Sequence, residues 1–441
     1  ATTTVDLSSG NLIYASQSAN TTVSFANSEN GNVYFIREKD ATTTARTITW
    51  PDRIKWDGGS APTLNSGNFT NEAQVFLLVT RDEGVTWDGK EVYGNPGGYE
   101  LFAWGANSYG TIGNNNRTTY SSPIQLPGRS WQVYKCSDQG YVNFFAKGNT
   151  LWSVGYDGAG GLGQNNTQKY SSPTQIGTDS TWSTFSNSRF NPKAVKTDNT
   201  LWSWGQNESG QMGLNNSAPN DHGYSSPTQI AGTTWSSVST GKENALALKT
   251  DGTMWAWGYG ENGVLGLNQP TNAKQSSPTQ IGTDTDWAKL TLSAAYSNAA
   301  IKTNGTLWVW GRGSYMINLG LNDKVNYSSP TQVGTDTTWS NVTSSRQTFM
   351  ATKTDNTLWV WGCNEKGGLG LNEGDNSITT GRSSPTQIPG TWSLDQIRSI
   401  GNGEGNMAMK ADGTLWGWGT GSTLYNAPDS RSSPTQMPGT W

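Results

Sequence analysis

Alternating apolar and polar residues recur along most of the chain as paired runs, with a period of about fifty residues. The clearest copy is the segment 244–258, in which Leu246 and Leu248 alternate with smaller or polar neighbours. Asp251-Gly252 then supplies the backbone that a tight turn needs, and Trp255 and Trp257 resume the alternation. An Asp-Gly pair between two alternating runs is a strong hairpin signal, so this stretch predicts a β-hairpin.

Three features repeat in the same order and define the unit. They are the hairpin with its Trp-x-Trp-Gly arm, a Ser-Ser-Pro segment, and a lone Trp. The second arm appears at 201–205, 254–258, 307–311, 358–362 and 415–419. Incomplete copies of it, with one Trp each, appear at 101–105 and 151–155. The prolines are Pro123, Pro173, Pro227, Pro278, Pro330, Pro385 and Pro434, and the lone Trp residues are Trp131, Trp182, Trp235, Trp287, Trp339, Trp392 and Trp441.

Each unit is expected to form four strands: one after the lone Trp, two in the hairpin, and one in the extended Pro-Thr-Gln segment. Four strands in about fifty residues, repeated seven times, predict an all-β, seven-bladed β-propeller. The first unit begins at its third strand, so the prediction is six full blades and a half-blade. We expect the edge of the half-blade to be covered by strands from residues 73–80 or 85–93, or by a neighbouring subunit.

The first 93 residues do not share the repeat. Alternating runs at 22–25, 32–37, 46–50 and 73–79, separated by turn signals, predict a small β-sandwich domain that precedes the propeller. The Gly- and Pro-rich segment 94–98 is the predicted linker, and the propeller is predicted over 99–441.

The repeats resemble the regulator-of-chromosome-condensation repeat family. The likeness is carried by Gly241, by 249–252, by Trp257-Gly258, by 263–266 and by Pro278. It implies the propeller fold, and a family that includes exchange factors for small GTPases and chromatin binders. The position where members often carry His is Asn244 here, so we do not expect the exchange activity to carry over.

The N-terminal segments 47–64 and 79–89 resemble a small β-module of bacteriophage structural and tail-fibre proteins. This resemblance covers about a fifth of the chain. It implies that the first domain attaches to a virus particle.

Charge and composition narrow the classes of function. Residues 1–92 hold 11 acidic and 7 basic side chains, which leaves 22 of each in the repeats, so the net charge of −4 belongs to the first segment. A neutral propeller without a basic stripe argues against nucleic acid as a partner. No apolar run or N-terminal signal indicates membrane insertion or secretion, so we expect synthesis in a host cytoplasm. Cys136 and Cys363 are expected to be thiols without metal-ligand spacing.

The chain offers little catalytic chemistry. With one histidine, His222, it has no Ser-His-Asp or Cys-His arrangement and no zinc cluster. The Asp residues of the hairpins stand where turns favour Asp, Asn or Gly, so we interpret them as turn residues and not as calcium ligands. Fixed register places the Trp residues of the repeats in the core. We therefore predict no enzyme activity, no cofactor and no metal.

Partner binding is expected in the loops between each Trp-Gly and the next Ser-Ser-Pro, which vary most in length. Tyr and Arg are favoured at interfaces, and these loops carry several. The candidate residues are Tyr109, Arg117, Tyr156, His222, Tyr259, Arg312, Tyr315, Glu365, Arg382 and Tyr425.

The favoured hypothesis is a non-enzymatic bacteriophage virion structural or adhesion protein of the tail-fibre, spike or head-decoration type. Its N-terminal domain would bind other virion proteins, and its propeller loops would bind a host-surface glycan or protein, with homo-oligomers an open option. The alternative is a cellular or secreted lectin-like or protein-interaction propeller scaffold. A GTPase exchange factor is a more distant alternative.

Overall fold

The computed structural model describes two units, 1–99 and 100–441. In the first unit it describes the backbone of the strands β1 to β8. In the second it describes residues 101–126, 131, 133–136, 141–188, 190–217, 223–292, 297–314, 319–344, 348–373, 381–400, 405–420 and 430–437.

The first unit contains two sheets. One is parallel and has the order β1-β3-β5, and the other is mixed and has the order β2-β4-β7-β8-β6. The described backbone of this unit consists of β-strands, while its organisation as a β-sandwich stays a prediction because no side chain of this unit is described. The strands are β1 (Thr2–Asp6), β2 (Leu12–Ser16), β3 (Thr21–Ala26), β4 (Gly31–Glu38), β5 (Ile48–Thr49), β6 (Ile54–Trp56), β7 (Gln74–Thr80) and β8 (Trp87–Tyr93).

The second unit contains six antiparallel sheets of four strands and one sheet of two. The two-stranded sheet is β9 (Phe102–Gly105) with β10 (Tyr120–Gln125). The first three blades are β11 (Val133–Cys136), β12 (Val142–Lys147), β13 (Thr150–Gly155), β14 (Tyr170–Gln175); β15 (Trp182–Ser186), β16 (Lys193–Lys196), β17 (Leu201–Gly205), β18 (Tyr224–Ile230); and β19 (Trp235–Thr240), β20 (Asn244–Lys249), β21 (Met254–Gly260), β22 (Ala273–Gln280).

The next three blades have the same strand order. Two short 3-10 helices, η2 (Glu261–Gly263) and η3 (Glu365–Gly367), lie in loops that precede fourth strands. These blades are β23 (Trp287–Leu292), β24 (Ser297–Lys302), β25 (Leu307–Gly311), β26 (Tyr327–Gln332); β27 (Trp339–Ser344), β28 (Thr348–Lys353), β29 (Leu358–Gly362), β30 (Arg382–Ile388); and β31 (Trp392–Ile400), β32 (Gly405–Lys410), β33 (Leu415–Gly419), β34 (Arg431–Gln436).

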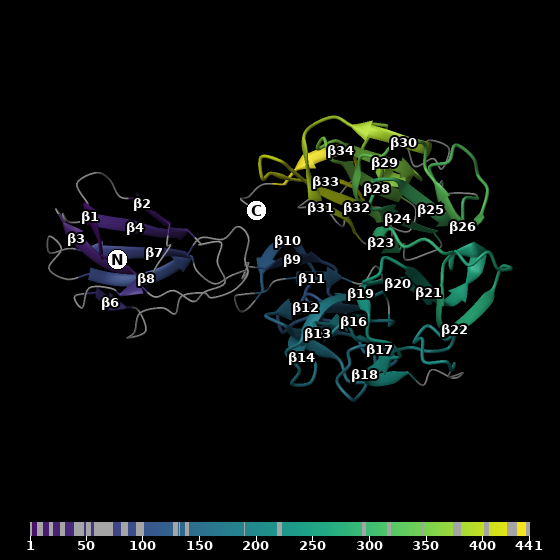
Figure 1. Cartoon of the computed structure of the whole chain (residues 1–441), viewed down its shortest axis with the longest axis horizontal. Helices are drawn as coiled ribbons and strands as arrows, with labels where there is room; N and C mark the ends of the chain where they lie inside the picture. Colours follow the sequence, from purple (N-terminus) through teal and green to yellow (C-terminus); the bar gives the residue numbers. More distant parts are fainter. Residues whose placement is uncertain are drawn as a thin grey trace. The chain divides into compact units, whose positions relative to one another are not determined.

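The blades follow one another around a ring (Figure 1). The first strands of successive blades contact one another, as β19 does with β15 and β23, so these strands lie innermost. The fourth strands, with the Ser-Ser-Pro segment, lie at the rim (Figure 1). The propeller with six four-stranded blades is therefore confirmed.

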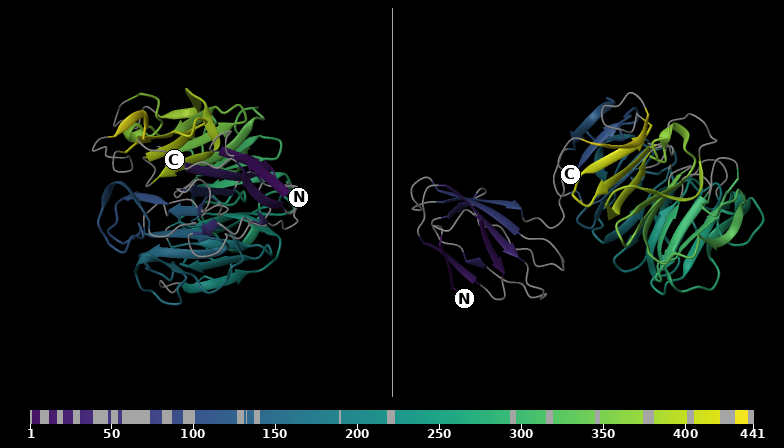
Figure 2. Two further views of the ribbon diagram at one scale, coloured as in Figure 1. Left: turned by 90° about the vertical axis from the view of Figure 1, so that its left-hand side faces the viewer. Right: turned by 90° about the horizontal axis from the view of Figure 1, so that it is seen from above.

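The two-stranded sheet corresponds to the third and fourth strands of a blade. Completion of this sheet to a seventh blade stays a prediction. The strands proposed to complete it, β7 and β8, instead pair with each other, with β4 and with β6 inside the first unit (Figure 2). The backbone groups of these strands are thus used in their own sheet, and how the edge of the half-blade is covered stays a prediction.

The predicted hairpin forms, with its turn at Asp251-Gly252. Asn244 pairs with Gly258 and Leu248 with Met254 across β20 and β21. Gly252 adopts a φ of 78°, the left-handed conformation that the turn requires. The strand is buried on both faces along 244–248, because each blade packs face to face against its two neighbours.

Tryptophan burial follows register. The second Trp of the hairpin is 0% exposed in five blades, and the lone Trp is at most 7% exposed at every described position. The first Trp of the hairpin, such as Trp255, is half-buried. Each fully buried indole contributes roughly 4 to 6 kcal/mol of gross apolar burial, an upper bound given the extended-chain reference. The prediction of core packing is confirmed for two of the three registers, except at Trp104 of the two-stranded sheet, which is half-buried.

The second Trp also joins neighbouring blades. The indole Nε1 of Trp257 donates a hydrogen bond to the carbonyl oxygen of Gln211 in the preceding blade, at 2.9 Å. A Cβ added to Gly213 would lie 2.8 Å from that same Nε1, so only glycine leaves room for the ring. Trp204, Trp310 and Trp418 make the same contact with Gly161, Val264 and Gly368.

An Asn–Ser contact joins the blades a second time, at the rim. The Asn that follows the Gly-x-x-Gly loop takes a positive φ, and its backbone N–H donates to a Ser carbonyl of the next blade at 2.7 to 2.8 Å. The Ser belongs to the Ser-Ser-Pro segment, so two separate landmarks of the repeat meet here. The pairs are Asn115 with Ser171, Asn165 with Ser225, Asn215 with Ser276, Asn268 with Ser328, Asn322 with Ser383 and Asn372 with Ser432.

Candidate functional site

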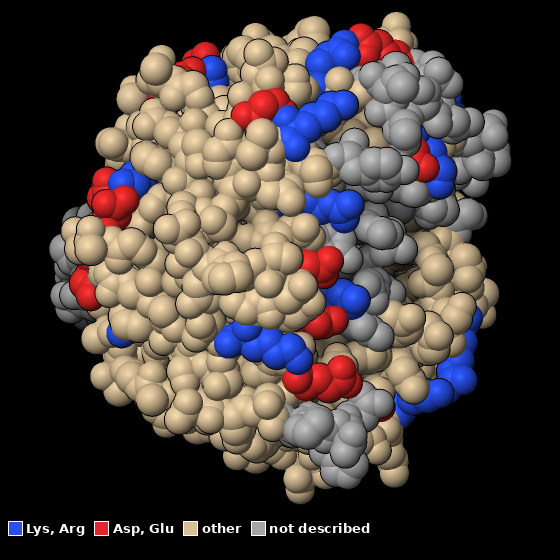
Figure 3. All heavy atoms as spheres, turned by 90° about the vertical axis from the view of Figure 1, so that its right-hand side faces the viewer, with Lys and Arg blue, Asp and Glu red and all other residues tan. Residues whose placement is uncertain are grey.

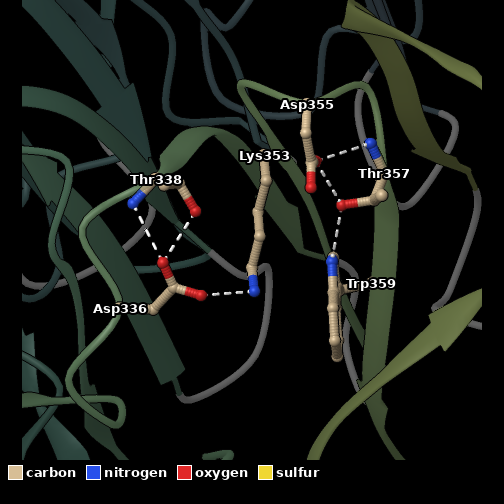
Figure 4. A network of polar contacts seen from close by, with 6 residues as sticks. All are labelled: Asp336, Thr338, Lys353, Asp355, Thr357 and Trp359. Carbon is tan, nitrogen blue, oxygen red and sulfur yellow. Dashed lines mark hydrogen bonds and ion pairs between the residues drawn. The ribbon is translucent and has the colours of Figure 1, made fainter.

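The hairpin turn carries a polar network that recurs from blade to blade. In Figure 4, Asp355 accepts hydrogen bonds from the backbone N–H of Thr357, at 3.1 Å, and from its Oγ1, at 2.6 Å. The Thr357 Oγ1 in turn accepts from Nε1 of Trp359, at 2.9 Å. Lys353 lies 4.0 Å from the centroid of the Trp359 ring and pairs with Asp336. The aspartate is thus engaged by its own turn.

The same turn network repeats at Asp198, Asp251 and Asp412. The Thr hydroxyl lowers the pKa of each of these carboxyls and that of Asp355. The ammonium of Lys353 lowers the pKa of Asp336 to about 2. The interpretation of the hairpin aspartates as turn residues is therefore confirmed, and the network belongs to the scaffold.

One group of described loop residues does not belong to this repeated frame. Tyr109, Tyr141, Tyr156 and Phe190 form an aromatic cluster, which we call the tyrosine cluster. Ring centroids are 5.2 Å apart for Tyr109 and Tyr141, 5.3 Å for Tyr109 and Tyr156, and 6.2 Å for Tyr141 and Tyr156. Phe190, which is 9% exposed, lies 5.3 Å from Tyr141 and 5.9 Å from Tyr156 and forms the base of the cluster.

The cluster is assembled from loops of three successive sheets. Tyr109 lies between β9 and β10, Tyr141 precedes β12, Tyr156 follows β13, and Phe190 lies between β15 and β16. Tyr109 is 39% exposed, and Tyr141 and Tyr156 are half-buried. Lys169 places its Nζ 4.5 Å from the centroid of the Tyr156 ring.

Equivalent positions in other blades show that the fold does not require these aromatics. The N–H of Tyr156 donates to the carbonyl of Tyr141, and the same bond joins Tyr259 to Glu243 two blades further on. Glutamate thus fills the place of Tyr141 there. The turn in which the N–H of Gly210 donates to the carbonyl of Asn207 matches the turn that contains Tyr109. Ser209 therefore occupies the place of Tyr109 in that turn. The place of Tyr156 holds an aromatic residue in Tyr259 but a glutamine in Gln206, whose N–H donates to the carbonyl of Phe190. The fold therefore requires an aromatic residue at none of these three places.

A buried carboxyl lies directly beside the cluster. Asp157 follows Tyr156, is 3% exposed, and neither of its oxygens has a hydrogen-bond partner of good geometry among the described residues. Burial raises its pKa to about 6, although backbone N–H groups of 159–162 oppose the shift. Asn207, at the equivalent position, accepts from the N–H of Met212 and donates to Asn216, so an amide fits this place without charge.

The structure brings two of the ten candidate residues together, Tyr109 and Tyr156. Tyr141 and Phe190 were missed, although an aromatic residue directly ahead of a hairpin arm, where another unit has Glu, was a usable signal. Arg117 is exposed, and Tyr259, Arg312 and Glu365 are half-buried. Arg382 pairs with Glu373. His222, Tyr315 and Tyr425 lie outside the described residues.

Charge of one sign does not gather on the face of the propeller that Figure 3 shows. On the side of the propeller that carries β22 and β26, Lys and Arg lie next to Asp and Glu over a mostly uncharged surface (Figure 3). Among the described residues no three His, Cys, Asp or Glu side chains are grouped as metal ligands, and none of the helices is long and apolar enough to cross a membrane. Cys363 is buried and forms no disulfide with another described residue, and the side chain of Cys136 is not described.

The sequence matches a known repeat. The model of the regulator of chromosome condensation (RCC1) repeat matches residues 198–248 and 251–295, and a second model of this repeat matches 235–264. The ultraviolet-B receptor UVR8 of Arabidopsis thaliana is 27% identical over 191 residues, and the human E3 ubiquitin-protein ligase HERC2 is 28% identical over 186. These alignments cover 41% and 40% of this chain but only 40% of UVR8 and 4% of HERC2.

Solved structures show the same fold. Prp20p from Saccharomyces cerevisiae aligns with a TM-score of 0.66 at 16% identity, over 78% of this chain and 87% of Prp20p. Human WBSCR16 aligns with a TM-score of 0.67 at 19% identity, over 77% of this chain and 94% of WBSCR16. Together with the blade geometry, these matches show that the chain carries regulator of chromosome condensation repeats, folded into a β-propeller.

Proposed function

We propose that this chain is a non-enzymatic display and adhesion protein, whose propeller presents its loops to a partner while its N-terminal unit attaches it to a larger particle. The observation that carries the proposal is the tyrosine cluster. It is partly exposed, and it stands at positions where the repeat frame tolerates Ser and Glu.

The loop residues that all blades share and those that differ between blades have separate roles, and this supports the proposal. The Gly and Asn residues of each loop join neighbouring blades, and the hairpin aspartates are held by their own turns. The polar groups that the repeat shares are thus used in holding the ring together. A function that needs a solvent-facing group is left to residues that differ between blades, and binding needs only such a surface.

The particle is proposed to be a bacteriophage virion, on the basis of the resemblance of segments 47–64 and 79–89 to phage structural modules. Localisation in the virion, contact of the N-terminal unit with other virion proteins, and contact of the propeller with a host-surface glycan or protein follow from this proposal. Mass spectrometry of purified particles tests it. The chain should appear in stoichiometric amounts, and its absence from intact particles would overturn the assignment.

A second candidate is a cellular interaction scaffold. The observation in its favour is that the relatives named above are eukaryotic proteins with the same repeat. Affinity capture with the full chain from a lysate of the cell that encodes it separates the two candidates. A single stoichiometric cellular protein that depends on Tyr109 would favour the scaffold.

A further inference from the structure

The tyrosines of the cluster differ in their hydroxyl groups from the other propeller tyrosines whose side chains the structure describes. The tyrosines that precede the Ser-Ser-Pro segments have hydrogen-bonded hydroxyls. The hydroxyl of Tyr120 accepts from Asn116 at 2.9 Å, and that of Tyr327 donates to Asp323 at 2.7 Å. The hydroxyls of Tyr109, Tyr141 and Tyr156 make no hydrogen bond to any described residue. They are therefore available to a ligand.

The dimensions of the cluster limit what it can hold. The centroids of its three tyrosine rings lie 5.2 to 6.2 Å apart. Together the tyrosine rings therefore span the width of one or two small ligand rings. A stable protein partner needs roughly 800 Å² on each side, whereas the cluster presents one ring that is 39% exposed and two that are half-buried. The size therefore favours a small ligand or the end of a chain-like one.

The charge of the cluster is close to neutral. Its cation, Lys169, already lies over Tyr156 at 4.5 Å, and the carboxyl of Asp157 is buried. Among the described residues no second cation lies over these rings, so an anionic ligand would find little to pair with. Aromatic faces carry partial negative charge and attract the slightly positive C–H groups of a saturated ring.

From these observations we propose that Tyr109, Tyr141 and Tyr156 form a binding site for a neutral sugar ring. The C–H face of a hexose or N-acetylhexosamine residue would stack on the exposed Tyr109 ring, and its hydroxyls would bond the hydroxyls of the three tyrosines. The inference deepens the proposed function, on which it rests, by naming the class of ligand.

The test uses the full chain and an array of oligosaccharides that end in glucose, galactose, mannose, N-acetylglucosamine or N-acetylgalactosamine. Sialylated and sulfated versions serve as anionic counterparts. We expect binding to neutral ends. Tyr109→Ser and Tyr156→Gln should each weaken it about tenfold, the effect of one lost aromatic contact of about 1.4 kcal/mol. Tyr109→Phe, which keeps the ring, should weaken it only a few-fold.

These substitutions are chosen so that folding is not at issue. Ser209 and Gln206 already occupy the equivalent places in another blade. Tyr327→Gln is the matched control. Gln275 occupies the position in the neighbouring blade that is equivalent to that of Tyr327, and Tyr327 lies outside the cluster. This control should bind like the unmodified chain.

Three results would overturn the inference. They are no binding to any neutral end, tighter binding to the anionic versions, and equal binding by the Tyr109→Ser and control chains. Adsorption to host cells that survives enzymatic removal of their glycans but is lost with Tyr109→Ser would indicate a protein partner, and would overturn the sugar site while keeping the adhesion proposal. Sugar binding by a chain that is absent from purified particles would reject the virion assignment and keep the site.

Discussion

At the scale of single residues, Asp157 is a carboxyl in a place built for an amide. Its pKa is raised to about 6 from an ordinary value of 3.8, so the folded chain is stabilised while this carboxyl is protonated, and the stability is lost as pH rises through 6. Asp157→Asn should therefore raise the free energy of unfolding at pH 7.5 by about 1 to 3 kcal/mol. Urea unfolding followed by tryptophan fluorescence measures this.

The same argument fixes the control. At pH 4, where the folded Asp157 is protonated and resembles an amide, the two chains should differ little. Asn207→Asp, at the equivalent position of the next blade, should lower stability at pH 7.5 and much less at pH 4. An equal gain from Asp157→Asn at both pH values would show that charge is not the cause.

Lys193 is the second residue whose charge conflicts with its place. It is 0% exposed, bonds the Oδ1 of Asn191, and pairs in register with Ser203, where the next blade has Leu246 paired with Ala256. Burial lowers its pKa well below 10.5. Below pH 10.5 the unfolded lysine is protonated, so burying Lys193 lowers the free energy of unfolding. This penalty fades as pH rises to 10.5.

Lys193→Met should therefore raise the free energy of unfolding by about 1 to 3 kcal/mol at pH 7, and by less at pH 10. Lys196→Met is the contrasting variant, because Lys196 pairs with Asp179 and lies 3.9 Å from the Trp202 ring centroid. That change should lower stability. Denaturant unfolding of both variants decides the matter, and a loss of stability in the Lys193 variant would contradict the account.

At the scale of elements, the Trp–Gly contact predicts a difference between two glycines with similar backbones. Gly213 and Gly113 have φ values of 74° and 88°, so alanine strains both alike. A Cβ at 213 would meet Trp257 at 2.8 Å, whereas one at 113 meets nothing nearer than 3.4 Å. Gly213→Ala should cost about 1 to 3 kcal/mol more than Gly113→Ala. Equal costs in urea unfolding would show that the ring is not held by this glycine.

The elements themselves could be predicted from the sequence because their signals are local. Alternation and an Asp-Gly turn set the hairpin of β20 and β21, and three landmarks in fixed order set the number of strands in a blade. The contacts between blades could not be predicted, since Asn115 meets Ser171 across more than fifty residues and each lies in its own repeat. For the same reason only Tyr109 and Tyr156 of the tyrosine cluster were predicted, because the rings of the cluster come from three sheets.

At the scale of the whole molecule, these charges combine into one pH profile. The lowered pKa values of Asp198, Asp251, Asp336, Asp355 and Asp412 mean that stability is present above pH 4 and lost as pH falls toward 2. Asp157 acts in the opposite sense and removes stability as pH rises through 6. Taken alone, these carboxyls make the propeller most stable near pH 4 to 5, while the fading penalty of Lys193 adds stability as pH rises further.

Thermal unfolding of the full chain from pH 2.5 to 8, followed by circular dichroism, checks this profile. The two limbs have separate origins, so they should respond to different substitutions. Asp157→Asn should flatten the limb above pH 5 and leave the acid limb in place. Replacing Thr357 by Val removes the hydroxyl that holds Asp355, and should weaken the acid limb while leaving the other unchanged. In a chain that also carries Lys193→Met, so that the fading penalty of the lysine cannot offset the upper limb, a profile that is flat from pH 2.5 to 8 would contradict the assignment of both limbs.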